Sequence, residues 1–175
     1  PHTPPPPPPP PPLFPYTTLF RSILYSTDLK GDGTEHVFRM ALGLAESTGA
    51  HLVALHAVES STLEIAPALK NMLSEDILEK FKSGGVQEYK EKLEQRLKAF
   101  CERECPNGKF PGGEPTFVVE EGKPQRIILE VAEKYNANLI IMGTRTHSSL
   151  GDGLLGSTAT KVIHRSKIPV LIYPL

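Results

Sequence analysis

Five short apolar runs, separated by segments with helical spacing, constrain the fold of this chain more than any other feature. The runs are rich in aliphatic and β-branched residues, as buried strands are, and they cover 23–27, 51–58, 115–120, 138–142 and 168–173. Between them, apolar residues recur every three or four positions over 34–48, 75–104, 123–135 and 157–163. Strands that alternate with helices predict a parallel sheet with helices on both faces and right-handed crossovers. We therefore expect one doubly wound, Rossmann-like α/β domain.

The first 22 residues differ in composition from the rest of the chain. Eleven of the 18 prolines lie there, including the unbroken run Pro4–Pro12. Such a run forms polyproline II or stays disordered, because it lacks backbone donors and apolar side chains. An SH3-type ligand or a rigid linker has this composition. We favour a third interpretation, since residues 13–22 resemble one reading frame of a short-read sequencing adapter. We therefore assign 1–22 to a disordered, dispensable artefact prefix and 23–175 to the folded domain.

The charge balance and the apolar content argue against several classes of function. Lys and Arg total 19 and Asp and Glu total 20, whereas a nucleic-acid surface needs a basic excess. No apolar run approaches the roughly 18 residues of a membrane-spanning helix. The two cysteines, Cys101 and Cys105, make no disulfide framework, and a metal site would need more ligands beside them. We expect a cytoplasmic domain that contacts neither nucleic acid nor membrane and holds no metal centre.

The segment from Gly143 to Ser157 carries the strongest functional signal. It follows the fourth predicted strand, and ligands of doubly wound sheets bind beyond the carboxyl ends of the strands. Its four glycines let backbone amides approach an anion closely. A helix that begins at Gly156-Ser157 also directs free N–H groups and a partial positive charge at that point. A phosphate cradle is one interpretation of this segment, and an ordinary βα loop with Ser157 as its N-cap is the other.

The same segment resembles the universal stress protein signature G-x2-G-x9-G-[ST]. Gly143, Gly156 and Ser157 occupy its first, third and fourth positions. The second position holds Thr146, where the signature has glycine. The threonine hydroxyl could donate to a phosphate, or its Cβ could obstruct the approach of the backbone. Both outcomes stay open at this point.

The resemblance extends over residues 23–175 and implies the details of the fold. It includes Ser26-Thr27-Asp28 at the end of the first predicted strand, Leu55-His56-Ala57-Val58 in the second and Lys167–Ile172 in the last. Members of the family have a five-stranded parallel sheet in the order 3-2-1-4-5, and some of them bind ATP. His56 is interpreted as a structural residue at a strand end.

The resemblance also implies where ATP, with or without magnesium, would bind. The base would lie between Asp28, Ala57 and Met142, since the acid after the first strand lies near adenine and ribose in ATP-binding members. The residues expected at the phosphates are Gly143, Gly156, Ser157 and Thr158, with Arg145 and Thr146 as further candidate donors.

Three functions remain compatible with the sequence. The first is an ATP-binding regulatory protein of the stress response, non-catalytic or a very slow ATPase. The second, motivated by Thr146, is a dimeric universal stress protein that binds no nucleotide. The third is an adenine-nucleotide enzyme of a related α/β class. Such an enzyme would need a phosphate loop of the Ser-Gly-Gly-x-Asp-Ser type after the first strand, whereas Ser83-Gly84-Gly85 falls in a helical segment and lacks the acid and the second serine. We also expect a homodimer through residues 168–173, because an apolar strand at a sheet edge invites pairing and family members pair this strand.

Overall fold

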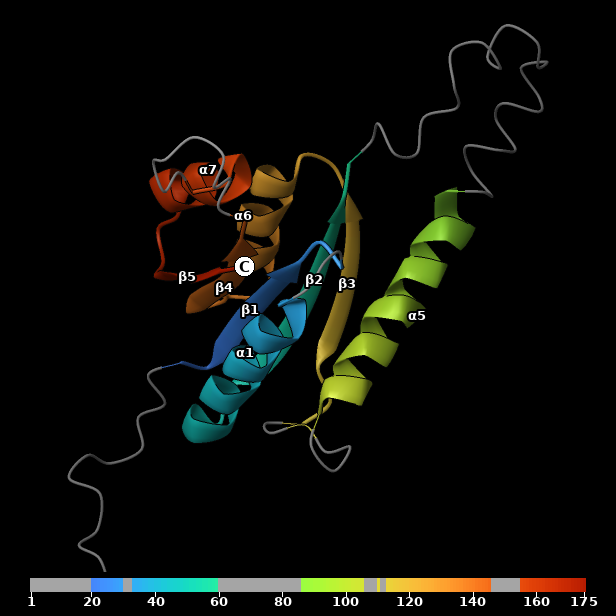
Figure 1. The fold of residues 1–175 in the computed structure, drawn as a ribbon, viewed down its shortest axis with the longest axis horizontal. Coiled ribbons are helices and arrows are strands. Elements are labelled where there is room, and N and C mark those ends of the chain that lie inside the picture. The colour runs from blue at the N-terminus through green and yellow to red at the C-terminus, as the bar shows by residue number, and fades with distance from the viewer. Residues whose placement is uncertain (1–19, 30–32, 60–85, 106–109, 111–112, 146–154) are drawn as a thin grey trace, which may run out of the picture.

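The computed structural model describes residues 20–29, 33–59, 86–105, 110, 113–145 and 155–175, and its elements are labelled as in Figure 1. The strands are β1 (Ser22–Thr27), β2 (His51–Val58), β3 (Thr116–Glu121), β4 (Leu139–Thr144) and β5 (Val170–Pro174). The helices are α1 (Thr34–Thr48), α5 (Val86–Glu104), α6 (Pro124–Lys134) and α7 (Ser157–Arg165). Strands and helices therefore alternate along the chain as the apolar pattern predicts.

The five strands form a single sheet in which all neighbouring strands are parallel. Their order is β3-β2-β1-β4-β5, which confirms the expected fold class and strand order. In the register, Ser26 of β1 lies opposite Met142 of β4, and Thr27 lies opposite His56 of β2. The carboxyl ends of β1, β2 and β4 therefore meet at one edge of the sheet. The strand order reverses between β1 and β4, and ligands of doubly wound sheets bind at such a point.

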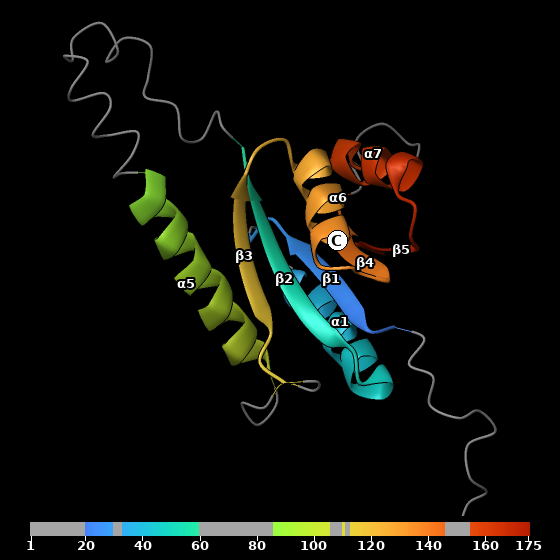
Figure 2. The same cartoon turned by 180° about the vertical axis from the view of Figure 1, so that it is seen from behind.

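Helices cover both faces of the sheet, α1 and α5 on one and α6 and α7 on the other (Figures 1 and 2). Tyr25 of β1 packs with Phe38 of α1 and Leu97 of α5 in one apolar cluster. Leu24, the preceding residue, belongs to a second cluster on the opposite face, with Ile128 of α6. Successive strand residues point to opposite faces. A strand covered on both faces therefore has apolar residues at nearly every position of its sequence.

The helices are amphipathic, and their ends agree with local sequence signals. Helix α1 buries Val37 and Phe38 among other residues and ends at Gly49, whose φ of 68° is a left-handed conformation that glycine adopts without strain. The nine-residue helix α7 buries Ala159 and Val162. None of the helices in the described residues combines the length and the apolar character needed to cross a membrane.

The two cysteines are part of the core. Cys101 and Cys105 are both buried, neither forms a disulfide within the described residues, and they belong to the apolar cluster beneath α1 and α5. Burial raises the pKa of the Cys101 thiol to about 12 and also raises the pKa of Cys105. A thiol that stays protonated at neutral pH is a poor nucleophile and a poor metal ligand, so both residues act as small apolar side chains.

Several element boundaries differ from the sequence prediction. Buried Ser22 already belongs to β1, and the carbonyl of Arg21 accepts a hydrogen bond from the N–H of His51 at 2.9 Å. The domain boundary expected between residues 22 and 23 therefore cuts into the first strand. The last three strands begin and end one or two residues later than expected, within the usual uncertainty of such boundaries. Of the helix expected over 75–104, residues 75–85 lie outside the described residues.

Candidate functional site

A cavity of about 490 Å³ lies at the sheet edge where β1, β2 and β4 end. Its walls also include the start of α7 and one side of α5. Of the nine residues expected at the site, eight line this cavity: Asp28, Ala57, Met142, Gly143, Arg145, Gly156, Ser157 and Thr158. The ninth, Thr146, lies outside the described residues. The fold thus brings together residues that are more than 100 positions apart in the sequence.

One side of the cavity, which we call the β1 rim, consists of Thr27, Asp28 and His56. The carbonyl of Thr27 accepts a hydrogen bond from His56 Nδ1 at 2.9 Å, so this ring nitrogen carries the proton in that contact. The Thr27 hydroxyl oxygen accepts a hydrogen bond from the N–H of Leu29 at 3.0 Å. Leu29 has a φ of 55°, which is uncommon for a side chain of its size. These contacts hold the backbone on either side of Asp28.

The opposite side, the α7 rim, consists of Gly156, Ser157 and Thr158. Gly156 is the N-cap residue of α7, and its N–H donates a hydrogen bond to Thr144 Oγ1 at 2.8 Å. The first hydrogen bond of the helix runs from the N–H of Thr160 to the carbonyl of Gly156 at 3.0 Å. The amides of the first turn have no acceptor within their own helix. This rim therefore presents backbone donors and the positive end of the helix dipole.

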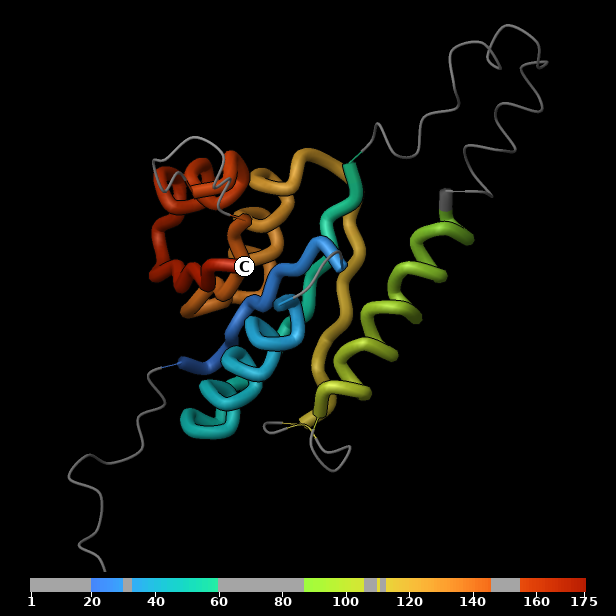
Figure 3. Tube along the Cα trace, viewed as in Figure 1, coloured from blue at the N-terminus to red at the C-terminus, as the bar shows by residue number. Residues whose placement is uncertain are grey.

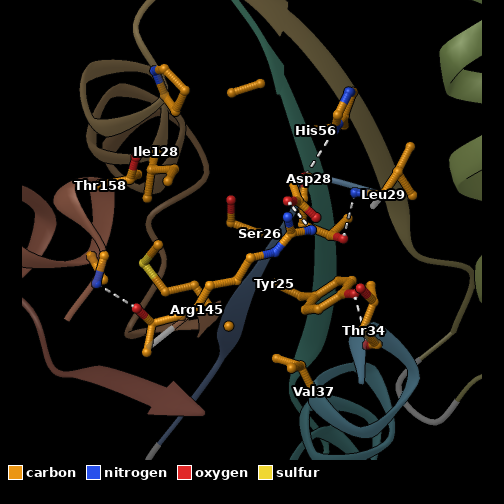
Figure 4. Close-up of a pocket in the computed structure, with 18 of the residues that line it drawn as sticks. Tyr25, Ser26, Asp28, Leu29, Thr34, Val37, His56, Ile128, Arg145 and Thr158 are labelled. Carbon is orange, nitrogen blue, oxygen red and sulfur yellow. Dashed lines mark hydrogen bonds and ion pairs between the residues drawn. The ribbon is translucent and has the colours of Figure 1, made fainter. Parts of the chain in front are cut away.

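Asp28 and Arg145 form an ion pair across the space between the two rims (Figure 4). The distance between Arg145 Nη2 and Asp28 Oδ2 is 3.1 Å, and both side chains are 53% exposed. The sequence predicted Asp28 beside the base and Arg145 beside the phosphates, but it gave no sign that the two side chains would meet. Ion pairs with this degree of exposure are weak, worth about 0–1 kcal/mol.

Gly143 has a different neighbour from the one expected. A Cβ at position 143 would lie 2.7 Å from Cδ1 of Leu175, so the absence of a side chain there makes room for the C-terminal leucine. The N–H of Leu175 donates to the carbonyl of Thr144 at 2.8 Å, and Figure 3 shows the C-terminus beside the end of β4. Leu175 lines the cavity and is a site residue that the glycine pattern did not predict.

Helix α5 supplies three further lining residues that sequence reasoning missed. Tyr89, Leu93 and Arg96 all line the cavity, and Arg96 Nη2 donates to the carbonyl of Leu29 at 3.2 Å. Their spacing of four and three places them on one face of the helix. That spacing was visible in the sequence, but it could not show that this face lies against the ends of β1 and β2.

The buried groups of the cavity wall are structural in character. Tyr25 donates from its hydroxyl to the carbonyl of Thr34 at 3.3 Å, and burial raises the pKa of its phenol. Tyr25 is therefore neutral at physiological pH and cannot act as a base there. Within the described part of the chain, no three His, Cys, Asp or Glu side chains gather as the ligands of a metal ion would.

Comparison with known proteins decides the family. The model of the universal stress protein family matches residues 19–174, which is nearly the whole chain. The chain belongs to the universal stress protein family. A universal stress protein of Thermus aquaticus is 30% identical over 157 residues, which cover 88% of this chain and 98% of the relative. The resemblance inferred from the glycine signature and the strand ends is thereby confirmed.

Solved structures of universal stress proteins share the fold. The structure of MJ0577, a universal stress protein of Methanocaldococcus jannaschii, has a TM-score of 0.62 and 24% identity, covering 90% of this chain and 97% of that one. A universal stress protein of Archaeoglobus fulgidus in complex with dAMP has a TM-score of 0.52 and 20% identity, covering 88% and 98%. Another, in complex with cAMP, has a TM-score of 0.53 and 20% identity, covering 89% and 97%.

Proposed function

We propose that this universal stress protein binds an adenine nucleotide, ATP, in the cavity at the ends of β1, β2 and β4. The base would lie toward Asp28, Ala57 and Met142, and the phosphates toward Gly143 and the α7 rim. The observation that carries the proposal is the convergence of eight expected site residues on one cavity. Parallel strands and the first turn of α7 bring them there from four separate segments.

The cavity fits a nucleotide in size and in the distribution of its donors. Its volume of about 490 Å³ falls within the roughly 300–1,000 Å³ of small-molecule sites. The α7 rim offers backbone amides and two hydroxyls to an anion, and no lysine is needed for such a site. Apolar Ala57 and Met142 line the part where a planar base would lie. Leu175 lies beside Gly143 and narrows the space through which a phosphate would approach that glycine. The α7 rim is therefore the principal phosphate contact in this proposal.

The ligands of two relatives support the choice of an adenine nucleotide. The universal stress proteins solved with dAMP and with cAMP both hold an adenine base joined to a phosphate. Magnesium would accompany ATP through the phosphate oxygens, since this cation is commonly bound by substrate phosphates and water with few protein ligands.

We propose binding without turnover, or with very slow hydrolysis. His56, the histidine of the β1 rim, uses Nδ1 to hold the Thr27 carbonyl, and Tyr25 is a neutral donor. This contact makes His56 a support of the Thr27 backbone, and Tyr25 cannot act as a general base for an attacking water. Release of phosphate from ATP should stay at the rate of a protein-free control over hours, and rapid release would contradict a purely regulatory role.

We also propose a homodimer formed through residues 168–173. Strand β5 pairs with β4 at the edge of the sheet, and its residues Val170–Tyr173 are only half-buried. Helix α7, which contacts β5, carries a second exposed apolar side chain, Ile163, which is 40% exposed. Sedimentation at tens of micromolar, an order-of-magnitude choice near common subunit affinities, should give a dimer, and a monomer would contradict this assembly.

The direct test of the proposed function is a calorimetric titration of the full chain with ATP. We expect saturable binding of one ATP per chain. Failure to bind at millimolar ATP, a concentration that detects even weak sites, would favour the dimeric member that binds no nucleotide. The variant Thr146→Gly then distinguishes the two possible roles of Thr146, a hydroxyl donor to phosphate or an obstruction. A gain of ATP binding in this variant would identify Thr146 as the obstruction.

A further inference from the structure

We propose that the outer surface of α7 and the turn after it bind an acidic segment of a partner protein. All four side chains of this surface, which we call the basic face, are exposed: Lys161, His164, Arg165 and Lys167. None of the four lines the cavity at the ends of the strands. The basic face is therefore a second surface, and its ligand is separate from the proposed nucleotide.

The charge of this part of the chain is one-sided. Residues 155–175 contain three Lys and Arg side chains and no Asp or Glu. The other described helices, α1, α5 and α6, all contain acidic residues. In α5, Lys92 pairs with Glu88 one turn away, and in α6, Arg126 pairs with Glu130 in the same way. Helix α7 has no acidic residue for such a pair, so its positive charge is not balanced within the helix.

The charge of the basic face is not balanced by other parts of the described fold either. Within the described part of the chain, Lys161, Arg165 and Lys167 form no ion pair, whereas most of the other described Lys and Arg side chains do. Helix α6 contacts α7 and carries Glu130 and Glu133, but neither pairs with the basic face. Exposed cations that gather on one surface create a positive potential, which attracts an anionic partner and speeds its association.

The helix dipole explains only part of this pattern. His164 and Arg165 lie in the last turn of α7, where positive charge stabilises the negative end of the dipole. Lys161 lies in the middle of the helix and Lys167 lies beyond its end, so neither has this role. Positions 161, 164 and 165 have the spacing that places side chains on one face of a helix. A partner would therefore meet these three side chains together.

The basic face fits carboxylates of a short protein segment better than it fits a long polyanion. Arg165 can hold one carboxylate through two parallel N–H donors, and Lys161, one turn away, can bind a second. An anionic membrane is commonly bound by clusters of roughly four to eight Lys and Arg. The whole chain carries 19 basic and 20 acidic residues, so the rest of the molecule has an acidic excess that repels an extended polyanion. A short acidic segment meets the basic face alone.

The test measures binding of a fluorescein-labelled synthetic peptide to the full chain by fluorescence anisotropy at low ionic strength. The peptide consists of glutamate and alanine, with a glutamate at every third or fourth position. We expect saturable binding of one peptide per chain, which weakens as added salt screens the charges. The double variant Lys161→Gln/Arg165→Gln should lower the affinity by about fivefold to twentyfold, because one exposed ion pair contributes up to about fivefold to an equilibrium constant.

The double variant Lys92→Gln/Lys98→Gln is the matched control. It removes two exposed positive charges from α5, which covers the opposite face of the sheet (Figure 1), and it should leave peptide binding unchanged. A second control peptide, with glutamine in place of every glutamate, should not bind. Equal binding of the two peptides, no binding of the acidic peptide at about millimolar concentration, or equal losses in the two double variants would contradict the proposal.

Vesicles that contain phosphatidylserine and a duplex DNA test the other possible occupants of the basic face. We expect both to bind the full chain more weakly than the acidic peptide. If either binds more tightly and loses its affinity in Lys161→Gln/Arg165→Gln, the basic face is a membrane or nucleic-acid site and the proposal of a protein partner is wrong.

Discussion

The two rims of the cavity offer different kinds of donors and acceptors to a ligand. The α7 rim presents backbone amides at the start of a helix, and its glycine N–H is tied to Thr144 at 2.8 Å. The β1 rim presents the Asp28 side chain on a turn that Thr27 and His56 hold in place. Ligand binding by backbone amides is insensitive to most side-chain changes but is weakened by added bulk. Ligand binding by a side-chain acceptor depends on the identity of that side chain and on the hydrogen bonds that hold its backbone in place. Substitutions should therefore affect the two rims by different routes.

Gly156→Val should have the largest effect, because it places bulk on the α7 rim. A Cβ at position 156 would lie 3.1 Å from Thr144 Oγ1 and 3.6 Å from the carbonyl oxygen of Arg145, so the branched side chain displaces the start of α7. We expect ATP affinity to fall by roughly 100-fold or more, equivalent to about 3 kcal/mol, in a calorimetric titration. The matched control is Gly43→Val in α1, where an added Cβ meets no atom within 4 Å. Unchanged ATP affinity in Gly156→Val would show that the phosphates do not bind at the α7 rim.

Ser157→Ala should have an intermediate effect, because it removes a hydroxyl from the α7 rim and keeps the backbone amides. A hydrogen bond to a charged oxygen is worth roughly 1–2 kcal/mol, so ATP affinity should fall by about tenfold. Ser47→Ala is the control, since Ser47 donates to the carbonyl of Leu44 on an exposed part of α1. A loss in Ser157→Ala as large as that in Gly156→Val would mean that the hydroxyl, and not the backbone, dominates this rim.

Thr27→Val should have the smallest effect, because it acts on Asp28 through the turn. Valine keeps the shape of threonine but cannot accept the hydrogen bond from the N–H of Leu29. Loss of this support should lower ATP affinity by about threefold, less than 1 kcal/mol, and should leave tripolyphosphate binding nearly unchanged. Thr48→Val serves as the control, since the Thr48 hydroxyl donates to the carbonyl of Leu44 at the end of α1. Equal losses for ATP and tripolyphosphate would contradict the separation of the two rims.

The sequence predicted the framework of the site well, because that framework follows from periodicity. Continuous apolar runs identify strands covered on both faces, and the ends of parallel strands meet at one edge. That the strand ends carrying Asp28, Ala57 and Met142 meet at one edge follows from this pattern, whereas the choice of these three residues came from the resemblance to the family. The start of α7 was likewise predicted from Gly156-Ser157.

The contacts between distant segments could not be predicted in the same way. The pairing of Asp28 with Arg145 and of Arg96 with the Leu29 carbonyl depends on side-chain directions across β1, β4 and α5. Gly143 could be identified as important, but its neighbour Leu175 is 32 positions away in the sequence and meets it only because β5 extends beside β4. Local patterns carry no information about which distant side chain fills such a space.

The most direct test of the central claim is to follow the backbone amide signals of the α7 rim by NMR during titration. If the first turn of α7 binds the phosphates, the amide signals of Ser157 and Thr158 should shift strongly with ATP and hardly at all with adenosine. The amide signals of Asp28 and Ala57, on the base side, should shift with ATP and respond to adenosine as its concentration is raised. Binding of ATP that leaves the Ser157 and Thr158 signals unmoved would contradict the account.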